Sequence, residues 1–214
     1  MRTSRQVKDQ HHEEIVQAAS KMLRDRGIEQ TSVMDLMRAA GLTNGGFYRH
    51  FKSKEELIAE ATRKTYRELI AIMQERLEKH GAQAAVSAYV DDYLSGAHVD
   101  APEEGCAIAA YGTEAAREGS AVRQAFAEGM AQVLSLLAEG MPGPKAQRRE
   151  RATELQALMT GAVVMARTAG DVELSAKILN SARRRAAQLI GSAAPDISTD
   201  SRIARAGRQP RNAK

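Results

Sequence analysis

The sequence predicts an all-α protein, with a three-helix head followed by a larger helical body and about nine helices in all. Three observations carry this prediction. Apolar residues recur at the 3.6-residue spacing of helices along most of the chain. The commonest residues include Ala, Leu, Glu, Arg and Gln, which favour helix. Finally, no segment alternates apolar and polar residues as a strand would.

The first two helices are marked by their apolar pattern and their ends. A helix from about Asp9 to Arg26 carries an apolar stripe and stops at Gly27. Thr31 or Ser32 caps the next helix, which stops at Gly41. Their apolar residues are Ile15, Ala18, Ala19, Met22, Val33, Leu36, Met37 and Ala40.

A short third helix is predicted from about Asn44 to His50, after a three-residue break that begins at Gly41. Two apolar helices joined so tightly must cross steeply, which is the geometry of a helix-turn-helix. Phe47 and Phe51 are expected in the core of this head. The exposed residues between them suit the reading of a DNA major groove.

The body is predicted from capping and breaking signals. Ser53 and Glu56 form a capping box that opens a helix reaching about Lys79. Further helices are expected over about 82–95, 106–117 and 120–139, and two more end near Ala169 and Ile190. We therefore expect a head over residues 1–54, a body over 55–192 and a disordered basic tail over 193–214.

Charge and composition narrow the class of function. The net charge is +4, and residues 1–54 hold ten Lys or Arg against six Asp or Glu, whereas residues 103–139 hold two against six. This asymmetry suits a head that binds a polyanion. No apolar run is long enough to span a membrane, and the single cysteine fits a reducing cytoplasm. No nucleophile–base pair, metal-ligand spacing or phosphate loop is present, so we expect no enzyme, metal or cofactor.

Individual residues of the head are assigned to DNA by their chemistry. Asn44 can bond adenine, Arg49 can bond guanine, and Tyr48 offers a ring to a thymine methyl group. Glycine permits close backbone approach, and hydroxyl groups, lysines and His50 suit phosphate. The predicted DNA-binding residues are Thr31, Ser32, Thr43, Asn44, Gly45, Gly46, Tyr48, Arg49, His50, Lys52 and Lys54.

The segment from Thr31 to Leu57 resembles the DNA-binding domain of the TetR family of transcriptional repressors. The matching residues are Thr31-Ser32, Ala39-Ala40-Gly41-Leu42-Thr43, Gly45-x-Phe47-Tyr48-x-His50-Phe51 and Ser53-Lys54-Glu55-Glu56-Leu57. Gly46 departs from the alanine, serine or threonine usual in that family. The resemblance implies a bacterial, cytoplasmic, nucleoid-associated repressor with nine helices, which dimerises through its last two helices.

Such a homodimer would place two heads on successive major grooves, about 34–36 Å apart, on a near-palindromic double-stranded DNA operator. A small-molecule effector of unknown identity would release it. Small residues in the last two helices support the dimer, because they let helices approach closely. The predicted interface residues are Leu155, Leu158, Ala162, Ala166, Leu174, Ile178, Ala182, Ala186 and Leu189.

The effector pocket is predicted from soft and amphipathic side chains of the body. The candidates are Tyr89, Tyr93, Cys106, Tyr111, Phe126, Met130, Met159 and Met165. Each of them could instead only fill the core. Cys106 opens a helix, where a thiol pKa is lowered, so an electrophile- or oxidant-sensing repressor is one alternative. A helical interaction module without specific DNA binding is the other.

Overall fold

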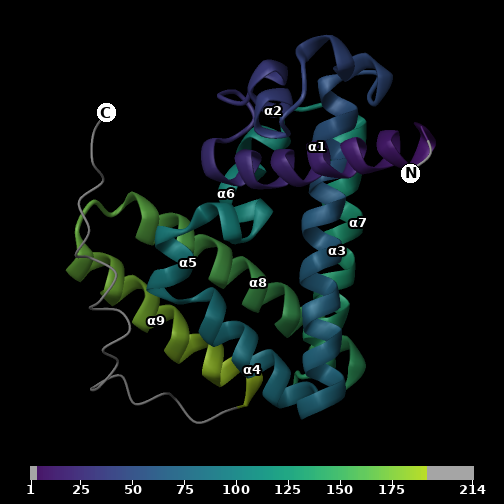
Figure 1. Cartoon of the computed structure of the whole chain (residues 1–214). Helices are drawn as coiled ribbons and strands as arrows, with labels where there is room; N and C mark the ends of the chain where they lie inside the picture. The colour runs from purple at the N-terminus through teal and green to yellow at the C-terminus, as the bar shows by residue number, and fades with distance from the viewer. Residues whose placement is uncertain (1–3, 192–214) are drawn as a thin grey trace. The chain divides into compact units, whose positions relative to one another are not determined.

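The chain is all helical in the computed structural model, which describes residues 4–191 (Figure 1). This confirms the predicted fold class. The predicted disordered tail, residues 193–214, lies outside the described residues. In chain order the elements of residues 4–191 are α1 Ser4–Arg26, α2 Val33–Ala39, the 3₁₀ helix η1 Asn44–Arg49, α3 Lys54–His80, α4 Ala82–Tyr93, α5 Gly96–Asp100, the 3₁₀ helix η2 Pro102–Glu104, α6 Ala107–Ala115, α7 Ser120–Glu139, α8 Lys145–Thr168 and α9 Val172–Ile190.

Three elements differ from the prediction: η1, the short α5 and the 3₁₀ helix η2, which lies where a break was expected. The number of α-helices in the described part is nine. The predicted third helix is the 3₁₀ helix η1, in which the Gly46 amide donates to the Thr43 carbonyl over 3.1 Å. Two consecutive glycines oppose a regular α-helix, and so short a segment closes more readily with bonds three residues apart. The short α5 was not predicted. It starts because the Ser95 hydroxyl accepts from the His98 amide over 3.1 Å.

The helix starts in the head follow the predicted capping residues with one correction. Ser32 is the cap of α2, and its Oγ accepts from the Asp35 amide over 3.1 Å. The capping box at α3 is half right. Ser53 Oγ accepts from the Glu56 amide over 3.1 Å, but the Glu56 carboxylate accepts from the Lys52 amide, not from Ser53. Its longer reach closes the turn one residue earlier.

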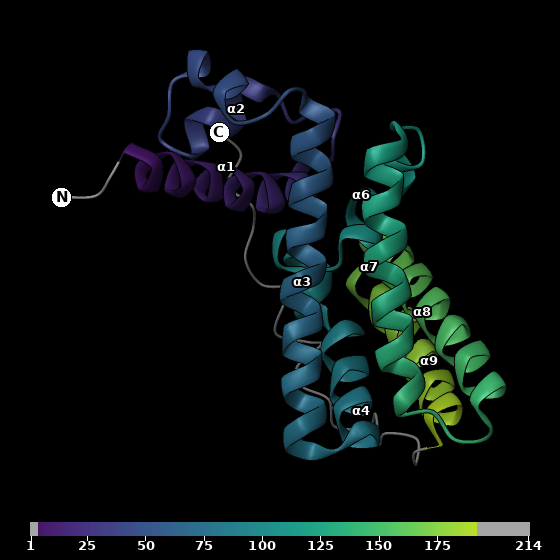
Figure 2. The ribbon, with the colours of Figure 1, turned by 90° about the vertical axis from the view of Figure 1, so that its right-hand side faces the viewer.

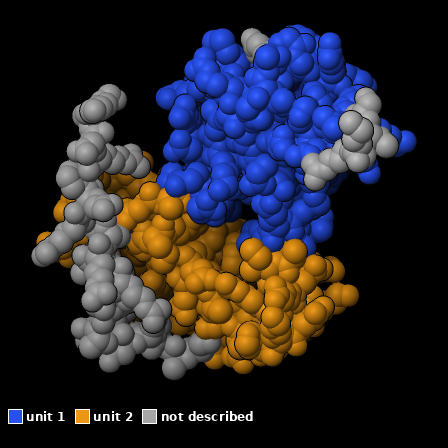
Figure 3. All heavy atoms as spheres, viewed as in Figure 1, with its two compact units in different colours: residues 1–70, 102–132 blue, residues 71–101, 133–214 orange. Residues whose placement is uncertain are grey.

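The chain forms two compact units, which Figure 3 colours separately. Unit 1 comprises residues 1–70 and 102–132, and unit 2 comprises residues 71–101 and 133–214. The core of unit 1 includes Ile15, Leu23, Leu36, Phe47, Leu57 and Tyr111, and that of unit 2 includes Val86, Leu137, Leu155, Met159 and Val163. The predicted boundary at residue 54 stays a prediction about where the DNA-binding part ends.

Within unit 2, α8 and α9 lie side by side in both ribbon views (Figures 1 and 2). Their apolar stripes face each other, and Leu155, Met159 and Leu179 are almost fully buried. Across the described residues no helix is both long and apolar enough to cross a bilayer.

Candidate nucleic-acid interface

Two buried rings hold the segment Thr43–His50, which we call the recognition segment. Phe47 and Phe51 are 1% and 2% exposed, and their ring centroids lie 5.6 Å apart. This confirms that both belong to the core of the head. Because these two rings fix the backbone, the side chains of the residues between them project in fixed directions.

The middle of the recognition segment is open to solvent. Tyr48 is 80% exposed, and Arg49 is also exposed. A Cβ atom added to Gly45 would meet nothing within 4 Å, and one added to Gly46 would lie 3.5 Å from Met37 Cε, an ordinary contact. Packing within the chain therefore requires neither glycine. Their backbone is accessible to an external partner, as the prediction of close DNA approach needs.

The predicted phosphate contacts surround this segment. Thr43 is the exposed N-cap of η1, and its side chain makes no capping bond, so its hydroxyl can serve another acceptor or donor. Lys52 and Ser32 are exposed. The Lys54 ammonium donates to the Ile28 carbonyl over 2.7 Å, which ties the start of α3 to the turn after α1. The side chain of Asn44 lies outside the described part, and its base contact stays a prediction.

One predicted side-chain contact is wrong. Thr31 is fully buried, and its hydroxyl donates to the Gly27 carbonyl over 2.6 Å. It closes the α1–α2 turn from inside and has no surface to offer a phosphate. Sequence could not separate Thr31 from Ser32, because both residue types cap helices.

His50 is half-buried at the end of the recognition segment. Its Nδ1 is buried without a hydrogen-bond partner among the described residues. Burial lowers the pKa of the His50 imidazole, and the neighbouring charges of His12, Lys8, His11 and Arg49 lower it further. A neutral ring is therefore favoured there, and a phosphate contact by His50 would be a dipolar hydrogen bond, not an ion pair.

Two polar links in unit 1 support the head and were not predicted. Arg24 is 6% exposed; its Nε donates to the Glu103 carbonyl over 2.6 Å, and Nη1 donates to Thr65 Oγ1 over 2.7 Å. Burial lowers the pKa of Arg24. Glu114 of α6 accepts from the Ile28 and Glu29 amides over 2.7 and 2.8 Å. The sequence offered one sign of these links, which was the position of Arg24 next to Leu23 on the buried face of α1.

The predicted pocket residues fall in both units. Cys106, Tyr111, Phe126 and Met130 belong to unit 1, and Tyr89, Tyr93, Met159 and Met165 belong to unit 2. The prediction is wrong for Met165, which is 58% exposed on the outer surface of α8. Cys106 is partly buried at the N-cap of α6.

Two tyrosines pack around Phe126 in unit 1: Tyr111, which the sequence analysis named, and Tyr66, which it did not. Tyr111 bonds Thr62 through their hydroxyl groups over 3.0 Å, and its ring meets Phe126 edge-on at 5.4 Å. Tyr66 meets Phe126 at 5.9 Å and is 5% exposed, but its hydroxyl has no hydrogen-bond partner within residues 4–191. Burial raises the pKa of Tyr66 well above its ordinary value.

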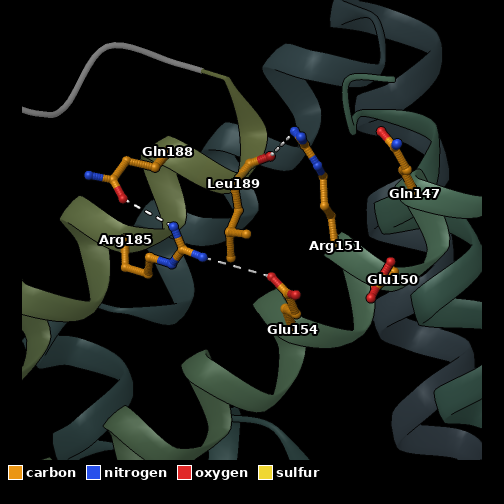
Figure 4. Close-up of a pocket in the computed structure, with 7 residues that line it drawn as sticks. All are labelled: Gln147, Glu150, Arg151, Glu154, Arg185, Gln188 and Leu189. Atoms are coloured by element: carbon orange, nitrogen blue, oxygen red, sulfur yellow. Dashed lines mark hydrogen bonds and ion pairs between the residues drawn. The ribbon is translucent and has the colours of Figure 1, made fainter. Parts of the chain in front are cut away.

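A surface hollow of about 420 Å³ in unit 2 lies between α8 and α9 (Figure 4). Its lining is polar: Arg185 faces Glu154 at 3.9 Å, and Arg151 Nη1 donates to the Leu189 carbonyl over 3.5 Å. No predicted effector-pocket residue lines it. Nowhere between residues 4 and 191 do three or more His, Cys, Asp or Glu side chains gather as metal ligands.

The predicted dimer interface needs a correction. Six of its residues pack inside unit 2: Leu155, Ala162, Ala166, Ala182, Ala186 and Leu189. Only Leu158, Leu174 and Ile178 keep appreciable surface. The periodicity found the stripes by which α8 and α9 pack within one chain, and a stripe alone does not say which neighbour covers it. The outward stripe of α8 consists of Ala157, Gly161, Val164, Met165 and Thr168.

Two family descriptions match the chain in succession. "Bacterial regulatory proteins, tetR family" matches residues 15–61, and "Transcriptional regulator LmrA/YxaF-like, C-terminal domain" matches residues 82–178. The first match contains the recognition segment, and the second includes α4 to α8.

Curated relatives match over part of the chain. The chain is 43% identical over 51 residues to the HTH-type transcriptional repressor KstR2 of Mycolicibacterium smegmatis, which is 24% of this chain and 25% of the relative. It is 26% identical over 95 residues to the uncharacterized HTH-type transcriptional regulator YfiR of Bacillus subtilis, 44% of this chain and 46% of the relative. The chain thus spans less than half the length of each of these relatives.

The fold has counterparts over most of its length. A transcriptional regulator of the TetR family from Agrobacterium tumefaciens superposes with a TM-score of 0.68 at 21% identity. That match covers 81% of this chain and 96% of the other. At such identity the likeness concerns the fold alone.

Proposed function

Because the chain belongs to the TetR family of DNA-binding transcriptional regulators, we propose that it is a homodimeric repressor on a near-palindromic operator, released by a small-molecule effector. The observation that carries the proposal is the recognition segment, with Tyr48 80% exposed beside Arg49 and two glycines that internal packing does not require. A tyrosine hydroxyl can bond a phosphate and an arginine can bond guanine, so these two exposed side chains suit contact with DNA.

Repression, and not activation, is supported by the matched relative KstR2, which is named as a repressor and shares 43% identity over 51 residues. A repressor needs only to occupy its operator, so the head and a dimer suffice. As a regulator acting on bacterial DNA, the protein would work at the nucleoid, in the cytoplasm.

The dimer is proposed to form through the outward stripe of α8 together with Leu174 of α9. Val164 and Met165 on α8 are 42% and 58% exposed, and Leu174 on α9 is 46% exposed. Exposed large apolar side chains on two helices that pack together suit a protein–protein interface. A Cβ atom added to Gly161 would meet nothing within 4 Å. A glycine at the centre of an apolar helix face lets a second helix approach closely, which a two-fold packing of α8 needs.

Release by an effector follows from linkage. A ligand that binds better to a conformation unfit for the operator lowers DNA affinity by its ratio of affinities for the two states. The buried aromatic groups in the two units offer apolar surroundings with hydroxyl groups, such as Tyr93 near Thr160 at 3.2 Å in unit 2. These suit a mostly apolar small molecule with a few polar atoms.

A second route of release would use Cys106. Cys106 is partly buried at the N-cap of α6. Under this alternative an electrophile releases the wild-type protein from DNA and leaves Cys106→Ser bound. Equal release of both proteins would exclude the thiol route and leave the reversible effector.

The experiment begins with selection of binding sites from random duplex DNA, followed by competition between a selected site and its scrambled version. We expect a near-palindromic consensus and strong preference for it. Tyr48→Ala and Lys52→Ala should weaken operator binding, whereas sedimentation should still show a dimer. Equal affinity for selected and scrambled DNA would reduce the protein to a helical module without specific DNA binding.

A further inference from the structure

The first turns of α1 carry a basic surface that no part of the helix-turn-helix signature includes. α1 begins at Ser4, five residues before the predicted start. It crosses α3 within unit 1, and its N-terminal turns project past α3 (Figure 1). Arg5 and Lys8 lie on these turns and are exposed, and neither makes an ion pair with a residue in the described range.

Arg5, Lys8 and His12 lie on one face of α1, since residues three and four apart are neighbours on a helix. Farther along, the same face carries Ile15 and Val16, which are buried in the core of the head. Toward its N-terminus the face thus changes from apolar to basic where α1 extends beyond the core. We call Arg5, Lys8 and His12 the α1 ridge.

His12 fixes this ridge to the recognition segment. Its ring stacks on Phe51 with centroids 4.6 Å apart and lies 6.0 Å from the His50 ring. Its Nε2 is 2.7 Å from a carboxylate oxygen of Glu60 on α3. The ridge therefore continues from the end of the recognition segment in a set direction. In keeping with this, the charge of Lys8 helps to lower the pKa of His50.

The spacing and charge of the ridge suit a phosphate strand. From His12 to Arg5 the helix rises about 10 Å, at roughly 1.5 Å per residue. Successive phosphates of one strand are displaced by about 3.4 Å along the duplex axis, so a few of them lie within that span. Among residues 4–12 Asp9 is the one carboxylate, at the edge of the ridge, and the Glu60 carboxylate is bonded to His12.

We propose that Arg5 and Lys8 of the α1 ridge bind the phosphate backbone of the DNA next to the groove that the recognition segment enters. This inference rests on the proposed DNA binding and extends it. The contacts carry no sequence information, so the ridge strengthens binding to operator and random duplex alike.

The test uses the full-length protein and a duplex of random sequence, so no operator needs to be known. The double variant Arg5→Gln with Lys8→Gln is compared with a control double variant, Lys79→Gln with Arg123→Gln. The control removes the same charge from exposed positions on α3 and α7. Binding is titrated by fluorescence anisotropy at several salt concentrations, and circular dichroism checks that each variant is folded.

Each lost phosphate contact should make the slope of log K against log salt shallower by about 0.9, hence by about 1.8 per bound protomer for the ridge variant. At 0.15 M salt this corresponds to a loss of roughly 30-fold in affinity per bound protomer. Asp9→Asn should change binding in the opposite direction. A ridge variant with the slope and affinity of the control would overturn the proposal. Preference of wild type for selected over scrambled sites would still stand in that case, so the two failures are distinguishable.

Discussion

The Glu114 carboxylate is expected to be a main support of the turn between α1 and α2. It accepts two backbone N–H groups, from Ile28 at 2.7 Å and Glu29 at 2.8 Å. Hydrogen bonds to a charged group contribute about 1.5–3 kcal/mol each. In Glu114→Ala the exposed Glu29 amide can bind water, whereas the amide of buried Ile28 is less easily hydrated. We therefore expect a loss of about 3 kcal/mol, which lowers the melting temperature by roughly 6–12 °C for a chain of this size.

The assay is thermal unfolding followed by circular dichroism, with hydrogen exchange at the Ile28 and Glu29 amides. Glu114→Gln keeps one acceptor oxygen and should lose about half as much stability. Glu118→Ala is the matched control, because this half-buried glutamate lies three residues after the end of α6. The reasoning is refuted if Glu114→Ala melts with the control, or if both amides keep their protection from exchange.

Four further substitutions test other parts of the molecule. Gly161→Arg should give a folded monomer by sedimentation, since the position is open within the chain but central to the proposed dimer face; an unchanged dimer would remove α8 from the interface. Tyr66→Phe removes a buried hydroxyl without a partner in the described range and should raise the melting temperature, by about 2–4 °C for each 1 kcal/mol regained, whereas Tyr111→Phe breaks the bond to Thr62 and should lower it. Burial lowers the pKa of His98, so the unfolded state binds its proton more readily than the folded state does, and stability should fall as pH drops below about 6.5. His98→Gln should flatten that dependence in melting curves recorded from pH 7.5 to pH 5, and an equally steep curve would exclude His98 as the group responsible.

Local signals predicted the fold well, since they depend on neighbours in sequence. The apolar periodicity, the terminal glycines and the Ser32 and Ser53 caps placed nearly every helix within a few residues. Anchoring by Phe47 and Phe51 was also readable, because large rings beside a turn in a small head have few other places to go. To predict these features it was enough to know which residues are apolar and where the helices stop.

Features that depend on distant partners were not readable. Arg24 is held by a carbonyl and a hydroxyl far along the chain, and Glu114 by amides 85 and 86 residues away. The predicted dimer interface was wrong for the same reason. The period of α8 identified Leu155 and Ala162 as apolar-face residues, but only packing shows that α9 of the same chain covers that face. The prediction for Thr31 was wrong because its neighbour Ser32 has the same capping chemistry, and the sequence does not show which of the two is exposed.

The polar links bear on what the DNA-reading part of the chain consists of. Contacts with DNA are expected to end near residue 54, but the buried core that orients the DNA-binding residues extends beyond residue 54. Leu57, Ile58 and Ala61 of α3 are at most 1% exposed and belong to the core of unit 1. Glu114 closes the α1–α2 turn from α6. A perturbation of α6 therefore reaches the turn before α2 through two hydrogen bonds, with no need for a change in the recognition segment itself. The non-helical backbone of Tyr111, at φ −138° and ψ 21°, already bends α6 one turn before Glu114. A ligand that straightens or sharpens this bend would shift the Glu114 carboxylate and so loosen the head.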